Sequence, residues 1–161
     1  MNSRRRIIVV TGSRSEYGLL RPVLLALREN PKIDLRLVVT GMHLARRFGY
    51  SIQEIRKDRF IISGCVPLNS GTGTPSGMAR YVGQGVLGLT NEFERLNPEI
   101  VMVLGDRTEA FSAAIAATYM NCVLAHIHGG DKSQGGVDES VRHAITKLAH
   151  LHFVATSQSA K

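Results

Sequence analysis

Six short apolar runs alternate with helical patterns along the chain, and this alternation restricts the fold more than any other feature of the sequence. Each run is rich in β-branched residues and almost uninterrupted by polar ones, which is typical of strands buried on both faces of a parallel sheet. The runs occupy residues 6–12, 34–41, 61–67, 99–106, 121–130 and 151–156. Strands that alternate with helices predict a doubly wound α/β sheet, for which we expect the Rossmann-like strand order 3-2-1-4-5-6.

The segments between the runs carry apolar residues at helical spacing. In residues 16–29, leucines and Val23 recur every three or four positions, and Pro22 predicts a kink. In residues 76–96, the predicted apolar stripe is Val82, Val86, Leu89, Phe93 and Leu96. Shorter helices are expected over 51–58, 107–120 and 138–149. A length of 161 residues fits one ordinary domain, so we expect residues 1–161 to form a single domain.

The balance of charge favours an anionic partner. The chain has 20 Lys and Arg against 13 Asp and Glu, a net charge of +7. The basic residues are scattered and no nucleic-acid-binding motif is present in the sequence, so a phosphate-bearing small molecule is favoured over nucleic acid. No segment approaches the ~20 apolar residues of a membrane span, so we expect a cytoplasmic protein without a membrane partner. Cys65 and Cys122 lie in apolar runs and are expected to be buried, reduced thiols.

Polar residues gather at one end of the predicted strands. In an open parallel sheet, ligands bind at the carboxyl ends of the strands, near the point where the strand order reverses. Four of the six runs end in polar segments there: Thr11-Gly12-Ser13-Arg14, Thr40-Gly41-Met42-His43, Gly105-Asp106-Arg107 and the stretch from His126 to Gly130. The opposite edge carries plain turns, Asn30-Pro31 and Asn97-Pro98. We therefore expect the site where the first, fourth and fifth strands end.

Two glycine-containing segments at this edge are open to more than one interpretation. TGSRSEYG, residues 11–18, could form an anion-binding nest in which Arg14 contacts a phosphate, or Ser13 or Ser15 could simply cap the following helix. The run Gly71-Thr72-Gly73-Thr74-Pro75-Ser76-Gly77 lacks the Lys-Ser/Thr pair of a P-loop. We expect Ser76 to cap the long helix, with the loop as a candidate flap over the site.

Asp106 also has two compatible interpretations. Asp106 and Glu109 have the spacing of a capping box, with Asp106 at the N-cap and Glu109 at N3. An aspartate at a strand end beside Arg107 is equally well placed to act as a base or to hold a ligand.

The histidines of the fifth run suggest either metal binding or packing. His126 and His128 are two apart, so on a strand they share a face, and Asp131 or Asp138 could complete a metal site. The alternative is that one histidine hydrogen-bonds within the interface between sheet and helix. Asp138 and Arg142 are four apart at a predicted helix start, where an ion pair is expected for structural reasons.

Four long motifs resemble the UDP-N-acetylglucosamine 2-epimerase family. They are TGSRSEYGLLRP, VTGMHL followed by FGYSIQEI, VLGDRTEAFSAAIAATYMN, and HIHGGD followed by VDESVRHAITKLAHLHFVAT. The resemblance covers nearly the whole chain and is strongest to the hydrolysing branch, which makes N-acetylmannosamine for sialic acid synthesis. It implies the N-terminal half of a two-domain fold of the glycosyltransferase-B type. It also implies elimination of UDP and addition of water with inversion at C2, without metal or nicotinamide cofactors.

The resemblance also implies roles for individual residues. Arg14 matches a nucleotide-contacting arginine, His43 matches a histidine near the site, and Asp106 and Asp138 match catalytic carboxylates, with Arg142 positioning the second. We expect further substrate contacts from Gly12, Arg107, Gly129 and Gly130.

His128 marks a departure from the family pattern, because some members have a catalytic Glu at this position. Either His128 or Asp131 would then carry the acid–base duty. The change leaves the sugar open, since a related branch acts on UDP-N,N'-diacetylbacillosamine. We expect the chain to be part of a longer, homo-oligomeric enzyme and to have little activity alone. The rival functions are a metal-dependent hydrolase built on His126, His128 and Asp131, and a non-catalytic nucleotide-binding module.

Overall fold

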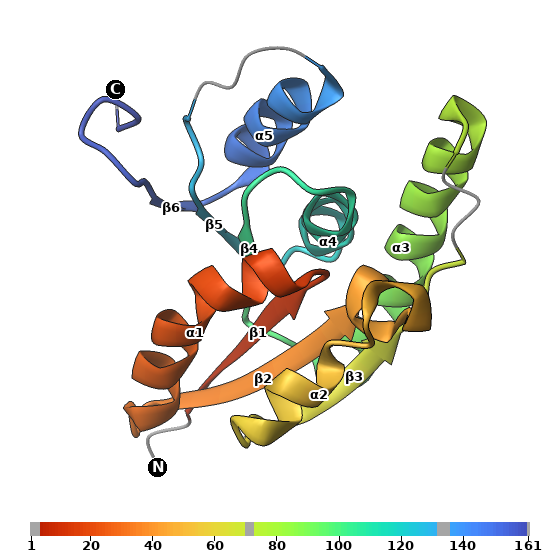
Figure 1. Ribbon diagram of the computed structural model, residues 1–161. Helices are drawn as coiled ribbons and strands as arrows, with labels where there is room; N and C mark the ends of the chain where they lie inside the picture. Colours follow the sequence, from red (N-terminus) through yellow and green to blue (C-terminus); the bar gives the residue numbers. More distant parts are fainter. Residues whose placement is uncertain (1–3, 70–72, 132–135, 161) are drawn as a thin grey trace.

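The computed structural model describes residues 4–69, 73–131 and 136–160, which form a six-stranded parallel sheet with helices on both faces (Figure 1). The strand order is β3-β2-β1-β4-β5-β6, as predicted. The strands are β1 (Arg5–Thr11), β2 (Ile33–Thr40), β3 (Ile62–Val66), β4 (Ile100–Leu104), β5 (Val123–Ile127) and β6 (Leu151–Phe153). The α-helices are α1 (Arg14–Glu29), α2 (Ile52–Lys57), α3 (Pro75–Leu96), α4 (Thr108–Tyr119) and α5 (Val137–Leu148).

Alternate residues of the central strands feed two separate cores, one on each face of the sheet. On one face, Ile8 and Val101 pack with Leu89 and Phe93 of α3 and with the alanines of α4. On the other face, Val9 and its in-plane neighbours pack with residues of α1 and α2. This division explains why the central runs are apolar throughout, because the central strands are covered on both faces.

The long helix α3 differs from its prediction in two ways. Its buried positions follow steps of four residues: Gly77, Tyr81, Gly85, Leu89 and Phe93. The predicted stripe is therefore correct for Leu89 and Phe93 but not for Val82 and Val86. Thr74, not Ser76, caps the helix, since the Thr74 hydroxyl accepts the backbone N–H of Gly77 at 3.0 Å. Residues 71 and 72 of the predicted flap lie outside the described part of the chain.

The predicted capping box at α4 is wrong. The N-cap residue is Arg107, and no side chain caps the helix. Gly105 adopts a φ of +72° at the end of β4, and this left-handed turn is one that glycine adopts at little cost. The turn carries Asp106 away from the α4 backbone, which frees its carboxylate for a different partner.

The two cysteines differ in exposure, which corrects part of the prediction. Both thiols are free, but Cys65 is exposed and only Cys122 is buried. Cys65 lies on β3, one of the two edge strands of the sheet. Within the described ranges, no helix combines the length and the apolar character needed to cross a membrane.

Two short 3-10 helices follow β2 and were not predicted. They span Gly41–Leu44 and Arg46–Phe48. Gly41 begins the first with a φ of +57°, and its backbone passes so close to Glu109 that an added Cβ would lie 2.3 Å from Oε1 of that residue. The 3-10 segment therefore sits directly over the start of α4, at the carboxyl edge of the sheet.

Candidate active site

A crevice opens at the carboxyl edge of the sheet, where β1, β4 and β5 end. Its lining residues are Ser15, Glu16, Leu19, Leu104, Gly105, Asp106, Arg107, His128 and Arg142. Of the predicted polar segments, those that follow β4 and β5 contribute to this lining, whereas none of the residues 11–14 does. Ser15 and Glu16, in the first turn of α1, line the crevice on the β1 side instead. Arg142 reaches the crevice from α5, on which it lies well inside the helix.

The ion pair between Asp106 and Arg142 is the central contact of the crevice. Nε of Arg142 donates to Oδ2 of Asp106 at 3.0 Å, and a terminal guanidinium nitrogen donates to the same oxygen. Both side chains are largely buried. The predicted pair of Arg142 with Asp138 is therefore replaced by a pair that joins α5 to the end of β4. Two N–H groups of the guanidinium converge on one carboxylate oxygen, Oδ2, and hold that oxygen in place.

His128 and Asp131 form a second acid–base pair beside Arg142. Nδ1 of His128 lies 3.3 Å from Oδ2 of Asp131, and a terminal guanidinium nitrogen of Arg142 is 3.8 Å from the same oxygen. The Ser159 hydroxyl donates to Oδ1 of Asp131 at 2.5 Å, and this bond is the main reason that the pKa of Asp131 is lowered. Asp131 and Arg142 also line a neighbouring cavity with Gly130 and His143.

His126 is a buried residue that hydrogen-bonds within the interface between sheet and helix, as the alternative to metal binding predicted. Its side chain is fully buried, Nε2 lies 2.7 Å from the carbonyl oxygen of Gly105, and Nδ1 lies 3.2 Å from the Thr146 hydroxyl. Burial lowers the pKa of His126. Because protein groups occupy both ring nitrogens, this imidazole is not free to bind a metal. Among the described residues, no group of three His, Cys, Asp or Glu side chains is placed to hold a metal ion.

His43 is buried beneath the site rather than exposed within it. Its Nε2 lies 3.1 Å from the Thr11 hydroxyl and its Nδ1 lies 2.8 Å from the Ser51 hydroxyl. Burial lowers the pKa of His43 to about 4. The neutral ring therefore joins the end of β1 to the segment after the second 3-10 helix. His43 does not line the crevice, and its contacts are those of a supporting residue, so its predicted role near a ligand stays a prediction.

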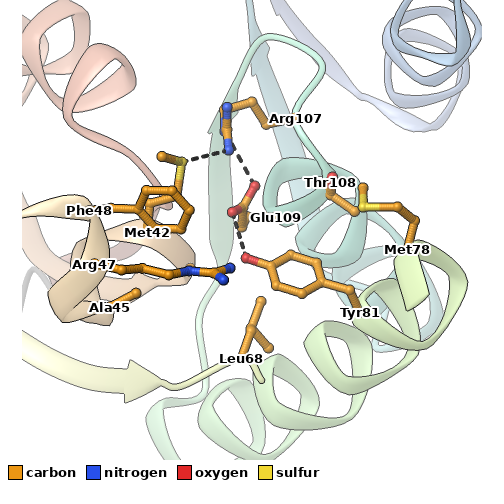
Figure 2. A pocket seen from close by; sticks show the side chains of 11 residues that line it. Met42, Ala45, Arg47, Phe48, Leu68, Met78, Tyr81, Arg107, Thr108 and Glu109 are labelled. Carbon is orange, nitrogen blue, oxygen red and sulfur yellow. Dashed lines mark hydrogen bonds and ion pairs between the residues drawn. The ribbon is translucent and has the colours of Figure 1, made fainter. Parts of the chain in front are cut away.

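Arg107 and Glu109 lie at the centre of a second cavity, next to the crevice (Figure 2). Nε of Arg107 is 3.3 Å from Oε2 of Glu109, and a terminal nitrogen donates to the sulfur of Met42 at 3.2 Å. The hydroxyl of Tyr81, on α3, donates to Oε1 of Glu109 at 2.9 Å. Burial raises the pKa of Tyr81, and Glu109 adds to the effect. Neither Glu109 nor Tyr81 was among the predicted site residues.

Glu16 is a further residue that the sequence prediction missed. Its carboxylate accepts the backbone N–H of Gly12 at 2.9 Å and the hydroxyl of Ser13 at 3.2 Å. Ser13 in turn caps α1 through the N–H of Glu16, so one of the two predicted caps is confirmed. The Ser13-x-x-Glu16 spacing resembles a capping box and could have indicated this role.

The remaining predicted residues lie around the crevice rather than in it. The Arg14 side chain is 76% exposed and pairs with Glu54 at 3.1 Å, and Asp138 is exposed in the first turn of α5.

The predicted glycines allow close packing within the protein. An added Cβ would lie 2.7 Å from Glu109 at Gly12, 2.7 Å from His126 at Gly129 and 2.4 Å from Ser159 at Gly130. The ligand contacts predicted for these residues stay predictions.

The sequence as a whole identifies the family. A model of the UDP-N-acetylglucosamine 2-epimerase family matches residues 25–161. Since this match covers most of the chain, the chain belongs to the UDP-N-acetylglucosamine 2-epimerase family.

Curated relatives belong to the same family and are much longer than this chain. The hydrolysing UDP-N,N'-diacetylbacillosamine 2-epimerase of Legionella pneumophila is 49% identical over 155 residues, 96% of this chain and 41% of that protein. Polysialic acid biosynthesis protein P7 of Escherichia coli is 42% identical, over 98% of this chain and 40% of that protein. The UDP-N-acetylglucosamine 2-epimerase of Neisseria meningitidis serogroup B is 34% identical, over 96% and 40%. The chain therefore spans about two fifths of the length of these relatives.

Solved structures confirm the predicted fold class. A crystal structure of a UDP-N-acetylglucosamine 2-epimerase matches with a TM-score of 0.85 at 24% identity, over 98% of this chain and 43% of that chain. The glycosyltransferase SnogD from Streptomyces nogalater matches with a TM-score of 0.52 at 16% identity, over 90% and 40%. At these identities the likeness shows the fold alone, a Rossmann-like α/β layer shared with epimerases and a glycosyltransferase.

Proposed function

We propose that the chain is the N-terminal domain of a hydrolysing UDP-sugar 2-epimerase. Such an enzyme converts a UDP-linked 2-acetamido sugar and water into UDP and the free sugar with inverted C2. The observation that carries the proposal is the crevice, because Asp106, Arg107, His128 and Arg142 line one surface at the carboxyl edge of the sheet. The proposed scheme uses no metal or nicotinamide, takes place in the cytoplasm and belongs to a homo-oligomer of the longer protein.

The crevice holds the types of group that this reaction needs. Loss of UDP leaves positive charge on the sugar and negative charge on the departing diphosphate, and cationic side chains stabilise the second. Arg107 and Arg142 are such cations. The reaction also moves a proton from C2 and returns one, which requires a base and an acid within hydrogen-bonding reach.

We assign the two proton-transfer roles to the two carboxylate-containing pairs. Asp106 is oriented by Arg142, so it is the group that we assign to removal of the C2 proton. His128, paired with Asp131, is assigned to proton return, because an imidazole can donate and accept protons near neutral pH. This assignment uses His128 where some family members have Glu.

Two substrates are candidates, and the relatives favour one of them. UDP-N-acetylglucosamine is the substrate that the family name suggests. The relative with 49% identity carries the name of a UDP-N,N'-diacetylbacillosamine 2-epimerase, whereas the UDP-N-acetylglucosamine 2-epimerase of Neisseria meningitidis serogroup B has 34%. We therefore propose that the diacetylated sugar nucleotide is turned over faster.

The test is to incubate the full-length protein with each sugar nucleotide and to follow UDP release and the sugar product by NMR. We expect the free C2 epimer from at least one of them. Asp106→Asn should lower kcat by about 100- to 10,000-fold, the usual contribution of a general base. Glu29→Gln, an exposed change at the end of α1, is the matched control and should leave kcat unchanged. Unchanged turnover in Asp106→Asn, or two inert sugar nucleotides, would contradict the proposal.

A further inference from the structure

Glu16 is a buried titratable group that the proposed chemistry does not use. Its side chain belongs to the first turn of α1, yet it is only 4% exposed and lines the crevice. The N–H of Gly12 and the hydroxyl of Ser13 both donate to one oxygen, Oε2. A carboxyl so far from water is costly to ionise, even with two hydrogen-bond donors beside it.

The charged side chains beside Glu16 include Arg107 and a second buried carboxyl, Glu109. Arg107 stands between two carboxyls, since its Nε is 3.9 Å from Oε2 of Glu16 and 3.3 Å from Oε2 of Glu109. Glu109 is itself buried, and it also faces His43, which is held neutral by burial. One guanidinium therefore serves two buried carboxyls, so it cannot fully compensate both of them.

The remaining charged groups line the crevice opposite α1. They are Asp106 at the end of β4, Arg142 from α5 and His128 after β5. Glu109 and Asp131 also lie within 4 Å of these arginines, at 3.3 Å from Arg107 and 3.8 Å from Arg142. Protonation of Glu16 removes one negative charge from this group of carboxyls and leaves Arg107 shared with one carboxylate fewer. The crevice is therefore more favourable to an anion when Glu16 is protonated.

We propose that Glu16 takes up a proton when a diphosphate-bearing ligand enters the crevice, so that anion binding is coupled to proton uptake from solvent. This inference rests on the proposed function for the class of ligand. The step is a binding equilibrium: the ionised protein, one proton and the anion give the complex of the protonated protein, and no covalent bond to the ligand changes. Glu16 is thereby a positioning residue for Arg107 and not a catalytic one.

The titration of Glu16 supports the coupling. The pKa of Glu16 is raised to about 7, because burial and, to a smaller extent, Glu109 outweigh the lowering effects of the Gly12 N–H, Arg107 and Ser13. A carboxyl with this pKa is partly protonated at neutral pH. A docked anion adds negative charge beside it and draws Arg107 toward the ligand, and both effects favour the protonated form.

The first measurement is a carbon-13 NMR titration of the Glu side chains in the full-length protein, with the Glu16 signal identified by its loss in Glu16→Gln. We expect a midpoint well above the ordinary value for Glu, and a rise of about one unit or more when UDP saturates the site, since a tenfold coupling equals one pKa unit. Inorganic pyrophosphate is the second probe. An ordinary midpoint, or a midpoint that neither anion moves, overturns the inference.

The second measurement is the affinity for UDP from pH 7.5 to 9, where the phosphate, with a pKa of about 6, stays fully ionised. We expect the Kd of the wild-type protein to rise across this range, by at most about tenfold in total for a one-unit pKa shift. Glu16→Gln keeps the shape and an oxygen that can accept the Gly12 N–H, but it cannot ionise, so its Kd should stay flat. Equal slopes in both proteins overturn the inference.

These outcomes are separate from those of the proposed function. Failure of the proposed function would appear as absence of UDP release from both sugar nucleotides. Failure of the inference would appear as an unshifted Glu16 midpoint in the presence of UDP or pyrophosphate, whether or not the protein turns over a sugar nucleotide. Glu29→Gln again serves as the control, because this exposed glutamate should leave the slope of the UDP affinity unchanged.

Discussion

Arg142 approaches Asp106 through two nitrogens, and a lysine at this position could not reproduce that geometry. We expect Arg142→Lys to lower kcat/KM by about 10- to 100-fold, which corresponds to the ~1.5–3 kcal/mol of a hydrogen bond to a charged group. UDP release from the sugar nucleotide is the measurement. Arg21→Lys is the matched control, because Arg21 also donates to an aspartate, Asp58, through two nitrogens but lies mostly exposed away from the crevice. Equal losses in both variants would contradict a special role for Arg142.

His43 makes the stability of the fold depend on pH in the acid range. Its pKa is about 4 in the folded protein and about 6.5 in the unfolded chain, so the unfolded chain binds a proton first as the pH falls. The free energy of unfolding should therefore decrease between pH 6.5 and 4, by up to about 3 kcal/mol from this residue. Chemical denaturation of the wild type and His43→Gln at pH 7 and 4.5 measures the difference. The result that would contradict this is the same pH dependence in both proteins.

Glu16 acts on stability in the opposite direction. Its pKa is about 7 in the folded protein, so the folded state keeps a proton that the unfolded chain releases near pH 4.5. Stability from this residue is therefore lost as the pH rises from about 4.5 to 7. Because this range overlaps that of His43, the wild-type curve alone would show partial cancellation. The contribution of each residue is therefore measured as the difference in the free energy of unfolding between the wild type and His43→Gln or Glu16→Gln, by chemical denaturation at pH 4.5 and 7.

The sequence was sufficient to predict candidate site residues that directly follow a buried strand. Asp106 and His128 were predicted because they follow buried strands at the edge where ligands bind. Arg142 was expected from the family resemblance, as a partner of Asp138. Glu109 was mistaken for part of a capping box, and Glu16 was overlooked. Glu109 is bonded by Tyr81 from the distant helix α3, and the backbone passes close to it at Gly12 and Gly41. Glu16 accepts its hydrogen bonds from Gly12 and Ser13. Those approaches depend on the three-dimensional path of the backbone, which the residue pattern does not encode.

At the scale of elements, the glycines of α3 provide a matched test of packing against helix propensity. An added Cβ at Gly88 would lie 2.4 Å from the Val66 side chain on β3, whereas one at Gly83 would meet nothing within 4 Å. Gly83→Ala should raise the free energy of unfolding by about 1 kcal/mol, the usual difference between the two residues in a helix. Gly88→Ala should lower it by about 1–3 kcal/mol through overpacking. Chemical denaturation measures both, and a stabilising Gly88→Ala would contradict the described contact.

Strands were predicted more accurately than their ends or than the segments between them. The apolar runs located all six strands, but the predicted fifth and sixth extended beyond β5 (Val123–Ile127) and β6 (Leu151–Phe153). The positive φ of His128 turns the chain out of β5, so His126 and His128 do not share a strand face as predicted. Hydrophobicity marks a buried strand, whereas its end depends on the turn that follows.

For the whole molecule, topology was the most predictable level. Parallel strands joined by helices allow few arrangements, because crossover connections are nearly always right-handed, and the expected strand order was confirmed. A crevice lies at the carboxyl edge, where the strand ends predicted a site. Its internal pairing was not predictable, since the sequence spacing favoured Asp138, whereas Arg142 lies near Asp106 and Asp131 from two other segments.

The charge balance of the crevice leads to a prediction about the whole protein. Arg107 and Arg142 are each paired with carboxylates inside the described domain. A diphosphate must therefore compete with Glu109 and Asp106 for these cations, and further donors are needed to bind it tightly. We expect those donors in the part of the longer relatives that this chain, at about two fifths of their length, does not span.

The 161-residue chain should accordingly fold but release UDP at least about 1,000-fold more slowly than the full-length protein at equal concentration, a loss equal to ~4 kcal/mol. Its two buried clusters, one on each face of the sheet, give the domain cores of its own. Circular dichroism and a cooperative denaturation curve establish folding, and UDP release measures activity. Comparable rates would show that the crevice alone suffices. An unfolded chain would show instead that the rest of the protein is needed to stabilise the sheet, most plainly at β6, whose three residues are all exposed.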